Sequence, residues 1–484
     1  MILSDLGSLT VDALRAALDA GTVTSRAVVE THLARIARLD PTFGAIRCLA
    51  ADALDQADES DRRGSPRSPI EGIPVLIKDN IDVAGLPTTA GALALEHWMP
   101  AEDAPIVAAL RAAGAIILGK TNLSELANFL TEDMPSGYSS LGGQVLNPYD
   151  TSITPSGSSS GSGTAAALGL APLTVGTETD GSITSPAARQ SLVGMKPTLG
   201  LVSRTGIVPI APSQDTAGPM TRTVADAAAL LAVLAGPDPA DPVTADAADA
   251  AARVRTLVLD PGALAGVRLG VVRGEQGEDD KPDEHQLAVH EQALAALAAA
   301  GAVLADVTLP VLDRDDELAV LHYEFGPAVD RYLATRGNGG PPRSLADIQA
   351  WNRDHADVAL KFGQIHVDTA VAIDHERDRA TYQETRQRDL TTATTVLSAA
   401  LGDAEALVFP GNEGCSWAAR AGWPSIVVPA GYTANNRRPV GLMLVSRPWT
   451  DARLLALAYA FERAHPVRRP PEQINPAVFR RLVP

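Results

Sequence analysis

The stretch that decides the fold runs from residue 155 to residue 200. It opens with Pro155-Ser156-Gly157-Ser158-Ser159-Ser160-Gly161-Ser162-Gly163-Thr164 and later reads Thr177-Glu178-Thr179-Asp180-Gly181-Ser182-Ile183-Thr184-Ser185-Pro186-Ala187-Ala188. The segment between these two loops, 165–176, is rich in Ala and Leu and is long enough for a short helix followed by the start of a strand. Such a unit brings both loops near one edge of a sheet, where hydroxyls and free backbone N–H groups can meet an anion.

Two other interpretations of this stretch are weaker. A flexible Gly/Ser linker would not be followed at once by an apolar run with helix and strand character. The sequence Gly157-Ser158-Ser159-Ser160-Gly161 also matches the G-x-S-x-G nucleophile elbow, which requires a strand directly before it. The preceding residues, 147–155, are turn formers with two prolines, so we interpret the elbow match as accidental.

The composition limits the class of protein. The chain has 484 residues and 45% hydrophobic content, which is ample for one large domain. Its net charge of −18 and its lack of a dense Lys/Arg cluster predict no binding to nucleic acid or to an anionic membrane. Since no signal-peptide pattern and no run of ~18 apolar residues occurs, we expect a cytoplasmic protein. The two cysteines, Cys48 and Cys415, are expected to be buried free thiols.

The segments on either side of the central stretch alternate between strand and helix patterns, which predicts an α/β fold. Continuous apolar runs predict buried strands at 75–77, 115–118, 267–272, 406–410, 424–430 and 440–445. Helices are expected in the first 65 residues (including 49–61), at 123–129, at 286–300, over much of 317–400 and at 452–464. The Pro/Asp-rich segment 236–242 is the best candidate for a boundary.

One lysine stands at an unusual place. Lys78 ends the apolar run Val75-Leu76-Ile77, where burial of an ammonium group is costly. It is a strand end that reaches solvent, a structural partner of Asp79, or a functional group. Burial lowers the pKa of a lysine, and a neutral amine can serve as the base for a hydroxyl nucleophile. The backbone N–H groups of 179–182, just beyond a predicted strand, suit an oxyanion hole.

A literal P-loop pattern occurs at Gly114-Ala115-Ile116-Ile117-Leu118-Gly119-Lys120-Thr121. In a P-loop the four middle residues form a loop whose N–H groups hold phosphate. Here those residues are apolar and predict a buried strand, so we expect no nucleotide cofactor. The nine histidines show no ligand spacing, and we therefore expect no metal site either.

Five motifs occur in a definite order along the chain: Gly72-Ile73-Pro74-Val75-Leu76-Ile77-Lys78-Asp79-Asn80, Gly119-Lys120-Thr121-Asn122, Gly157-Ser158-Ser159-Ser160-Gly161-Ser162-Gly163, Thr179-Asp180-Gly181-Ser182-Ile183 and Gly194-Met195-Lys196-Pro197-Thr198. Through these motifs the chain resembles the amidase signature family over nearly its whole length. The resemblance implies one α/β/α domain over 1–484, with a mixed sheet covered by helices on both faces. Within it we expect N-terminal helices (1–65), a catalytic core (66–236), a largely helical substrate-side region (237–400) and a C-terminal return to the sheet (401–484).

The resemblance also implies a Ser–cis-Ser–Lys triad. By motif, Lys78 is the base, Ser158 follows a cis peptide bond and relays a proton, and Ser182 is the nucleophile. The oxyanion and substrate site would be lined by Thr179, Asp180 and Gly181.

The activity implied by the resemblance is hydrolysis of a carboxylic or peptide amide through an acyl-enzyme, without a cofactor, by a protein that could form a homodimer. The alternative is the A subunit of a tRNA-dependent amidotransferase, which shares the triad but needs partner subunits.

Two positions depart from the family pattern. Asp180 and Ser191 stand where the family usually has Gly. The variant around Ser182, with Phe362-Gly363-Gln364 further along, resembles the bacterial peptide-amidase branch. Because a carboxylate beside a developing oxyanion would oppose the reaction, we expect the Asp180 side chain to turn away from it and to accept hydrogen bonds from nearby loop groups.

Overall fold

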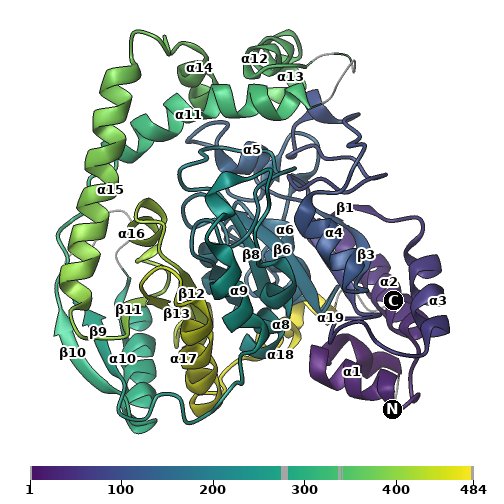
Figure 1. Ribbon diagram of the computed structural model, residues 1–484. Helices are drawn as coiled ribbons and strands as arrows, with labels where there is room; N and C mark the ends of the chain where they lie inside the picture. The colour runs from purple at the N-terminus through teal and green to yellow at the C-terminus, as the bar shows by residue number, and fades with distance from the viewer. Residues whose placement is uncertain (1–2, 274–281, 336–339, 341, 481–484) are drawn as a thin grey trace.

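A mixed sheet of 11 strands runs through the molecule (Figure 1). The computed structural model describes residues 3–273, 282–335, 340 and 342–480. The strands of this sheet are β1 (Ile46–Leu49), β2 (Pro74–Lys78), β3 (Ile116–Thr121), β6 (Leu173–Glu178), β7 (Val193–Lys196), β8 (Thr216–Thr221), β9 (Arg268–Val272), β10 (Val303–Val307), β11 (Ala406–Pro410), β12 (Ser425–Tyr432) and β13 (Pro439–Val445). Two short strands, β4 (Tyr138–Ser139) and β5 (Gly143–Gln144), form a separate hairpin.

The order of strands across the sheet is β1-β3-β2-β6-β8-β7-β12-β13-β11-β9-β10. Strand β2 is parallel to both of its neighbours, β3 and β6, so the three strands end at the same edge. From β6 to β11 the neighbours are antiparallel, and β9 is again parallel to β10 and β11. The parallel group places the ends of β2 and β6 side by side, which brings Lys78 close to the central Ser/Gly stretch.

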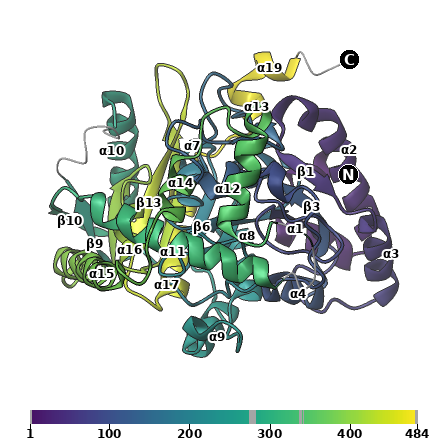
Figure 2. The same cartoon turned by 90° about the horizontal axis from the view of Figure 1, so that it is seen from above.

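Helices cover both faces of the sheet (Figures 1 and 2). They are α1 (Val11–Asp19), α2 (Ser25–Phe43), α3 (Ala53–Arg63), α4 (Pro105–Ala112), α5 (Glu125–Asn128), α6 (Ser160–Ala167), α7 (Thr184–Arg189), α8 (Val224–Leu234), α9 (Ala247–Arg255), α10 (Glu284–Ala299), α11 (Asp315–Ala334), α12 (Leu345–Asp354), α13 (Ala356–Ala359), α14 (Ile365–Val371), α15 (Arg379–Leu401), α16 (Cys415–Arg420), α17 (Asp451–Ala464), α18 (Pro471–Ile474) and α19 (Pro476–Arg480). Short 3-10 helices occupy Leu3–Ser8, Leu93–Leu95 and Pro242–Thr244.

The two faces of the sheet contribute side chains to separate hydrophobic cores. In β12, Ile426 and Val428 belong to the core on the side of α10 and α17, whereas Val427 between them belongs to the core on the side of α7. Side chains of successive strand residues point to opposite faces, so a strand buried on both faces is apolar throughout. The α/β/α arrangement that we expected from the sequence is therefore confirmed. Separately, no described helix is long and apolar enough to cross a membrane.

The expected helix at 123–129 is present only as the short element α5 (Glu125–Asn128), which is not a regular right-handed helix. The backbone there takes a left-handed turn at Leu126 (φ 48°), Ala127 (φ 57°) and Asn128 (φ 73°). Tertiary hydrogen bonds hold this turn, because the Leu126 N–H donates to the Ala90 carbonyl and the Glu125 carboxylate accepts the N–H of Ser140. These contacts override the helical propensity of the segment.

Other boundaries move by a few residues. The expected helix at 49–61 begins at Ala53, after the unexpected strand β1. Helix α6 begins at Ser160, inside the first Ser/Gly loop, and β6 follows it as expected. The division of the chain into four segments stays a prediction; β9 and β10 lie in the segment 237–400, together with helices α11 to α15.

Candidate active site

Lys78 is the last residue of β2 and is fully buried. Its Nζ lies 2.7 Å from Ser158 Oγ, 2.8 Å from Thr177 Oγ1 and 3.2 Å from the Thr177 carbonyl oxygen. Burial lowers the pKa of Lys78 well below its ordinary value, although the carboxylates of Glu178 and Asp215 act in the opposite direction. A neutral amine in contact with a serine hydroxyl can accept its proton.

The alternative of a structural pair between Lys78 and Asp79 is wrong. Asp79 instead pairs with Lys120, whose Nζ lies 3.2 Å from the Asp79 carboxylate. Lys120 is the lysine of the literal P-loop pattern, and it lies in β3 together with Ile116, Ile117 and Leu118. The segment that a P-loop would need as a loop is therefore a buried strand.

Ser158 precedes helix α6 and follows a cis peptide bond from Gly157, as expected. The Ser158 carbonyl accepts the N–H of Ser124, which anchors the loop to the segment after β3. The next residue, Ser159, donates its N–H to the Ser182 carbonyl at 3.1 Å. This bond joins the two Ser/Gly loops and brings Ser182 next to Ser158.

Glu178, at the end of β6, holds the loop that carries Ser182. One Glu178 carboxylate oxygen accepts the N–H of Ile183 at 2.7 Å and the N–H of Thr184 at 2.9 Å. Burial raises the pKa of Glu178, and burial also lowers the pKa of the neighbouring Lys196 to about 8. The loop therefore folds around a buried carboxylate on the side away from solvent.

The backbone N–H groups of the same loop can receive a ligand. Among the described residues, no acceptor takes the N–H of Asp180, Gly181 or Ser182. Gly181 has a φ of 73°, a left-handed conformation that glycine adopts without strain. Consecutive N–H groups of this kind beside a serine hydroxyl are the arrangement that an oxyanion hole requires.

The Asp180 side chain points to helix α16. Its Oδ2 accepts a hydrogen bond from Ser416 Oγ at 2.6 Å, and its Oδ1 is buried without a partner among the described residues. Asp180 is thus a hydrogen-bond acceptor, as expected, but its donor comes from a distant helix rather than from nearby loop groups. Cys415, beside it, is a free thiol, and Cys48 is free as well; both are partly buried.

Sequence reasoning missed several residues that support this arrangement. Thr177 contacts Lys78, and its hydroxyl also accepts a hydrogen bond from Asn80 Nδ2 at 3.0 Å. Asn80 is the last residue of the first of the five motifs, and that position could have indicated it. Glu178 lies inside the central stretch, whereas no local pattern indicates Ser416. Among the described residues, no group of three His, Cys, Asp or Glu side chains could hold a metal ion.

Comparisons with known proteins give consistent results. A family model described as Amidase matches residues 27–455. A probable amidase of Arabidopsis thaliana is 36% identical over an alignment that covers 96% of this chain and 91% of the plant protein. The X-ray structure of native peptide amidase from Stenotrophomonas maltophilia is similar with a TM-score of 0.88 and 43% identity, over 96% of this chain and 98% of that one. The A subunit of glutamyl-tRNA(Gln) amidotransferase from Symbiobacterium thermophilum is 34% identical over 92% of this chain and 94% of its own.

Proposed function

Because the chain belongs to the amidase family and is an amidohydrolase, we propose that Lys78, Ser158 and Ser182 are its catalytic residues and that its substrate is a peptide amide. The observation that carries this proposal is the contact at 2.7 Å between Ser158 Oγ and the buried amine of Lys78, whose pKa burial lowers. The similarity to a peptide amidase supports the substrate class.

The proposed reaction begins with two proton transfers. Ser158 gives its hydroxyl proton to the neutral Lys78 amine and takes the proton of Ser182, whose oxygen attacks the amide carbonyl. The N–H groups of Asp180, Gly181 and Ser182 would stabilise the oxyanion that forms. When the C–N bond breaks, Lys78 returns its proton through Ser158 to the leaving nitrogen, so that ammonia or an amine departs. Water then attacks the acyl-enzyme, releases the acid and restores Ser182.

The contacts around Lys78 suit this base. A neutral amine has two N–H donors and one lone pair. The Thr177 carbonyl can only accept, and the Thr177 hydroxyl can accept the second N–H. The lone pair of Lys78 is then left for the Ser158 hydroxyl, which is the direction that proton transfer needs.

The experiment that tests this proposal measures ammonia release from a dipeptide amide by the purified single chain. No ATP, tRNA or second protein is added. We expect steady turnover, and loss of turnover in Ser182→Ala. An intact, folded chain that releases no ammonia from dipeptide amides or from simple carboxylic amides contradicts the proposal.

A second candidate is the A subunit of a tRNA-dependent amidotransferase, which the 34% identity to such a protein favours. That function would require partner subunits before glutamine is hydrolysed. Turnover of peptide amides by the single chain selects the first candidate, whereas turnover only in the presence of partner subunits, glutamine and ATP selects the second.

Three further properties belong to the proposal: the absence of binding to nucleic acid or membrane, the location in the cell and the oligomeric state. The net charge of −18 supports a protein that binds neither nucleic acid nor an anionic membrane, and we propose a cytoplasmic location. We also propose that the chain can act as a homodimer; sedimentation of the purified protein checks the oligomeric state.

A further inference from the structure

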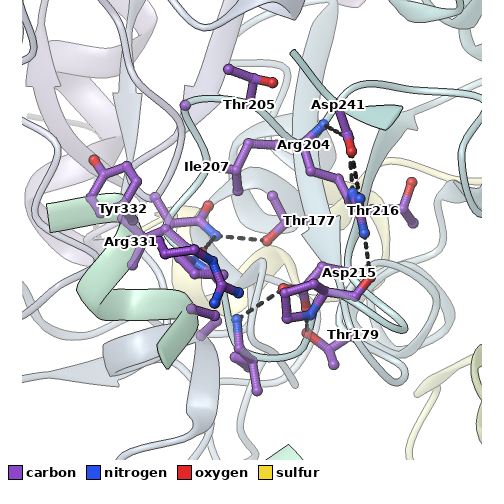
Figure 3. Close-up of a pocket in the computed structure, with 18 of the residues that line it drawn as sticks. Thr177, Thr179, Arg204, Thr205, Ile207, Asp215, Thr216, Asp241, Arg331 and Tyr332 are labelled. Carbon is purple, nitrogen blue, oxygen red and sulfur yellow. Dashed lines mark hydrogen bonds and ion pairs between the residues drawn. The ribbon is translucent and has the colours of Figure 1, made fainter. Parts of the chain in front are cut away.

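A cavity of about 430 Å³ lies between the end of β6 and helix α11. Figure 3 shows Thr177 and Thr179 beside it, with Arg331 and Tyr332 of α11 on another side. Of the three proposed catalytic residues, all of them described, none lines this cavity. Its wall is nevertheless only one side chain away from the proposed base, because the hydroxyl of Thr177, a residue of the wall, lies 2.8 Å from Lys78 Nζ.

The carboxylates around the cavity are already engaged. Asp241 binds the Arg204 guanidinium through both oxygens, with the Nε of Arg204 at 2.9 Å from Oδ2. Asp215 accepts the hydroxyl of Thr179 at 2.5 Å and a backbone N–H at 2.9 Å. Glu178 accepts the two backbone N–H groups of the Ser182 loop. Each acidic side chain in the wall therefore has its own donors.

Arg331 differs from Arg204, the other arginine in the wall. Among the described residues, none forms a hydrogen bond or an ion pair with the Arg331 guanidinium. Arg331 is exposed, and it also borders a second cavity of about 620 Å³ on the other side of Arg204 and Pro212. In that second cavity Arg386 lies 3.6 Å from Glu324. Within the described part of the chain, Arg331 is thus an unpaired cation where two cavities meet, near the proposed catalytic residues.

We propose that Arg331 is a specificity-determining residue that binds a carboxylate of the amide substrate, so that the enzyme favours peptide amides with an acidic side chain. The proposal rests on the proposed function, since it names the substrate class of the same site. A planar guanidinium binds a carboxylate through two parallel hydrogen bonds, and an unpaired one does so without first breaking an internal ion pair.

The test compares peptide amides that differ only in charge. The series Ac-Xaa-Phe-NH2 and Ac-Phe-Xaa-NH2, with Glu, Leu or Lys as Xaa, is assayed by ammonia release at pH 7.5. In the series whose variable residue binds nearest Arg331, we divide kcat/KM for the Glu substrate by kcat/KM for the Leu substrate. This ratio should fall about tenfold in Arg331→Gln, which corresponds to ~1.4 kcal/mol. Arg331→Lys should restore most of the ratio, and Arg331→Glu should shift the preference toward Lys.

The matched control is Arg377→Gln, which removes the same charge from an exposed arginine that pairs with Asp378 and borders neither cavity. Its Glu-to-Leu ratio should equal that of the wild type. An unchanged ratio in Arg331→Gln, in both series, overturns the inference.

A binding measurement separates failure of this inference from failure of the proposed function. Glutarate, a dicarboxylate without an amide, is titrated into the wild type and into Arg331→Gln by calorimetry. We expect binding about tenfold weaker in the variant, even if no peptide amide is hydrolysed. Equal affinity in the two proteins, or no binding to the wild type, overturns the inference while the proposed hydrolysis can still stand.

Discussion

Two buried lysines, at the ends of neighbouring parallel strands, differ in the groups that surround their amines. Lys120 has the Asp79 carboxylate at 3.2 Å, whereas the described groups that bond to Lys78 Nζ are two hydroxyls and a carbonyl, all uncharged. An ammonium without a touching carboxylate loses more from burial than it gains from its neighbours. Lys78 is therefore the one of the two that suits proton transfer.

The pH dependence of activity should follow Lys78. The base acts only when it is neutral, so kcat/KM should rise with pH through the Lys78 pKa. The Asp215 carboxylate favours the protonated form of Lys78, so Asp215→Asn should lower that pKa and move the acid limb of the profile to lower pH. The measurement is the pH profile of kcat/KM, with the exposed, remote Asp260→Asn as a charge-matched control. An acid limb that stays in place or moves to higher pH in Asp215→Asn contradicts the assignment.

Asp180 should help to hold the loop that carries Ser182, and with it the N–H groups proposed to bind the oxyanion, in position. Asp180→Ala removes the bond to Ser416, and Ser416→Ala leaves the Asp180 carboxylate without its donor, a loss of about 1–3 kcal/mol for a buried group. We expect both variants to lower kcat more than they change KM and to lower Tm. The double variant should be little worse than either single one, because one bond is lost in each case. Full kcat and unchanged Tm in both single variants would show that Asp180 has no role.

At the scale of elements, the central stretch was predictable and its surroundings less so. The apolar runs predicted the buried strands, and the central stretch predicted that the loops of Ser158 and Ser182 lie near one edge of the sheet. The left-handed turn at Leu126 was not predictable, because bonds to Ala90 and Ser140 decide it and those partners are distant in sequence. The same is true of α16, whose Ser416 reaches Asp180 across 236 residues.

The position of α16 depends on a buried ion pair with α15. Arg420 binds the Asp389 carboxylate, and their side chains are only 3% and 5% exposed. Arg420→Ala should lower the free energy of unfolding by ~3–5 kcal/mol, because it leaves a buried carboxylate unpaired. The double variant Arg420→Met with Asp389→Leu should recover most of this loss. The measurement is the urea midpoint, together with Tm.

The control for this pair is an exposed one. Arg377→Ala breaks the contact with Asp378 at the surface and should change stability by less than ~1 kcal/mol. A change in Arg420→Ala as small as that of Arg377→Ala would mean that α16 is held by its apolar contacts alone.

At the scale of the whole molecule, the sequence predicted much of the architecture because its motifs are long. The family and the sheet covered on both faces are confirmed, and the similarity to a bacterial peptide amidase agrees with the expected branch. Ser191, where the family usually has Gly, has a left-handed φ of 53°, which is a physical reason for Gly at that position. The role proposed for Arg331 was not predictable, since the sequence around an arginine on a helix does not indicate which cavity its side chain borders.

The complete reaction should need only this chain and water. In the proposed reaction Lys78 and the two serines supply the proton transfers and the nucleophile, so treatment with EDTA should leave kcat unchanged within error. Ammonia release before and after dialysis against EDTA checks this. Loss of activity that added zinc restores would contradict the proposed chemistry.

The most direct test of the central claim is ammonia release by Ser182→Ala beside Ser185→Ala. Ser185 lies in the same segment, where its hydroxyl contacts that of Ser156, and has no proposed part in the reaction. With both variants folded to the wild-type Tm, turnover of a dipeptide amide should fall at least about 10⁴-fold in Ser182→Ala and stay near the wild-type rate in Ser185→Ala. Wild-type turnover in folded Ser182→Ala would contradict the account.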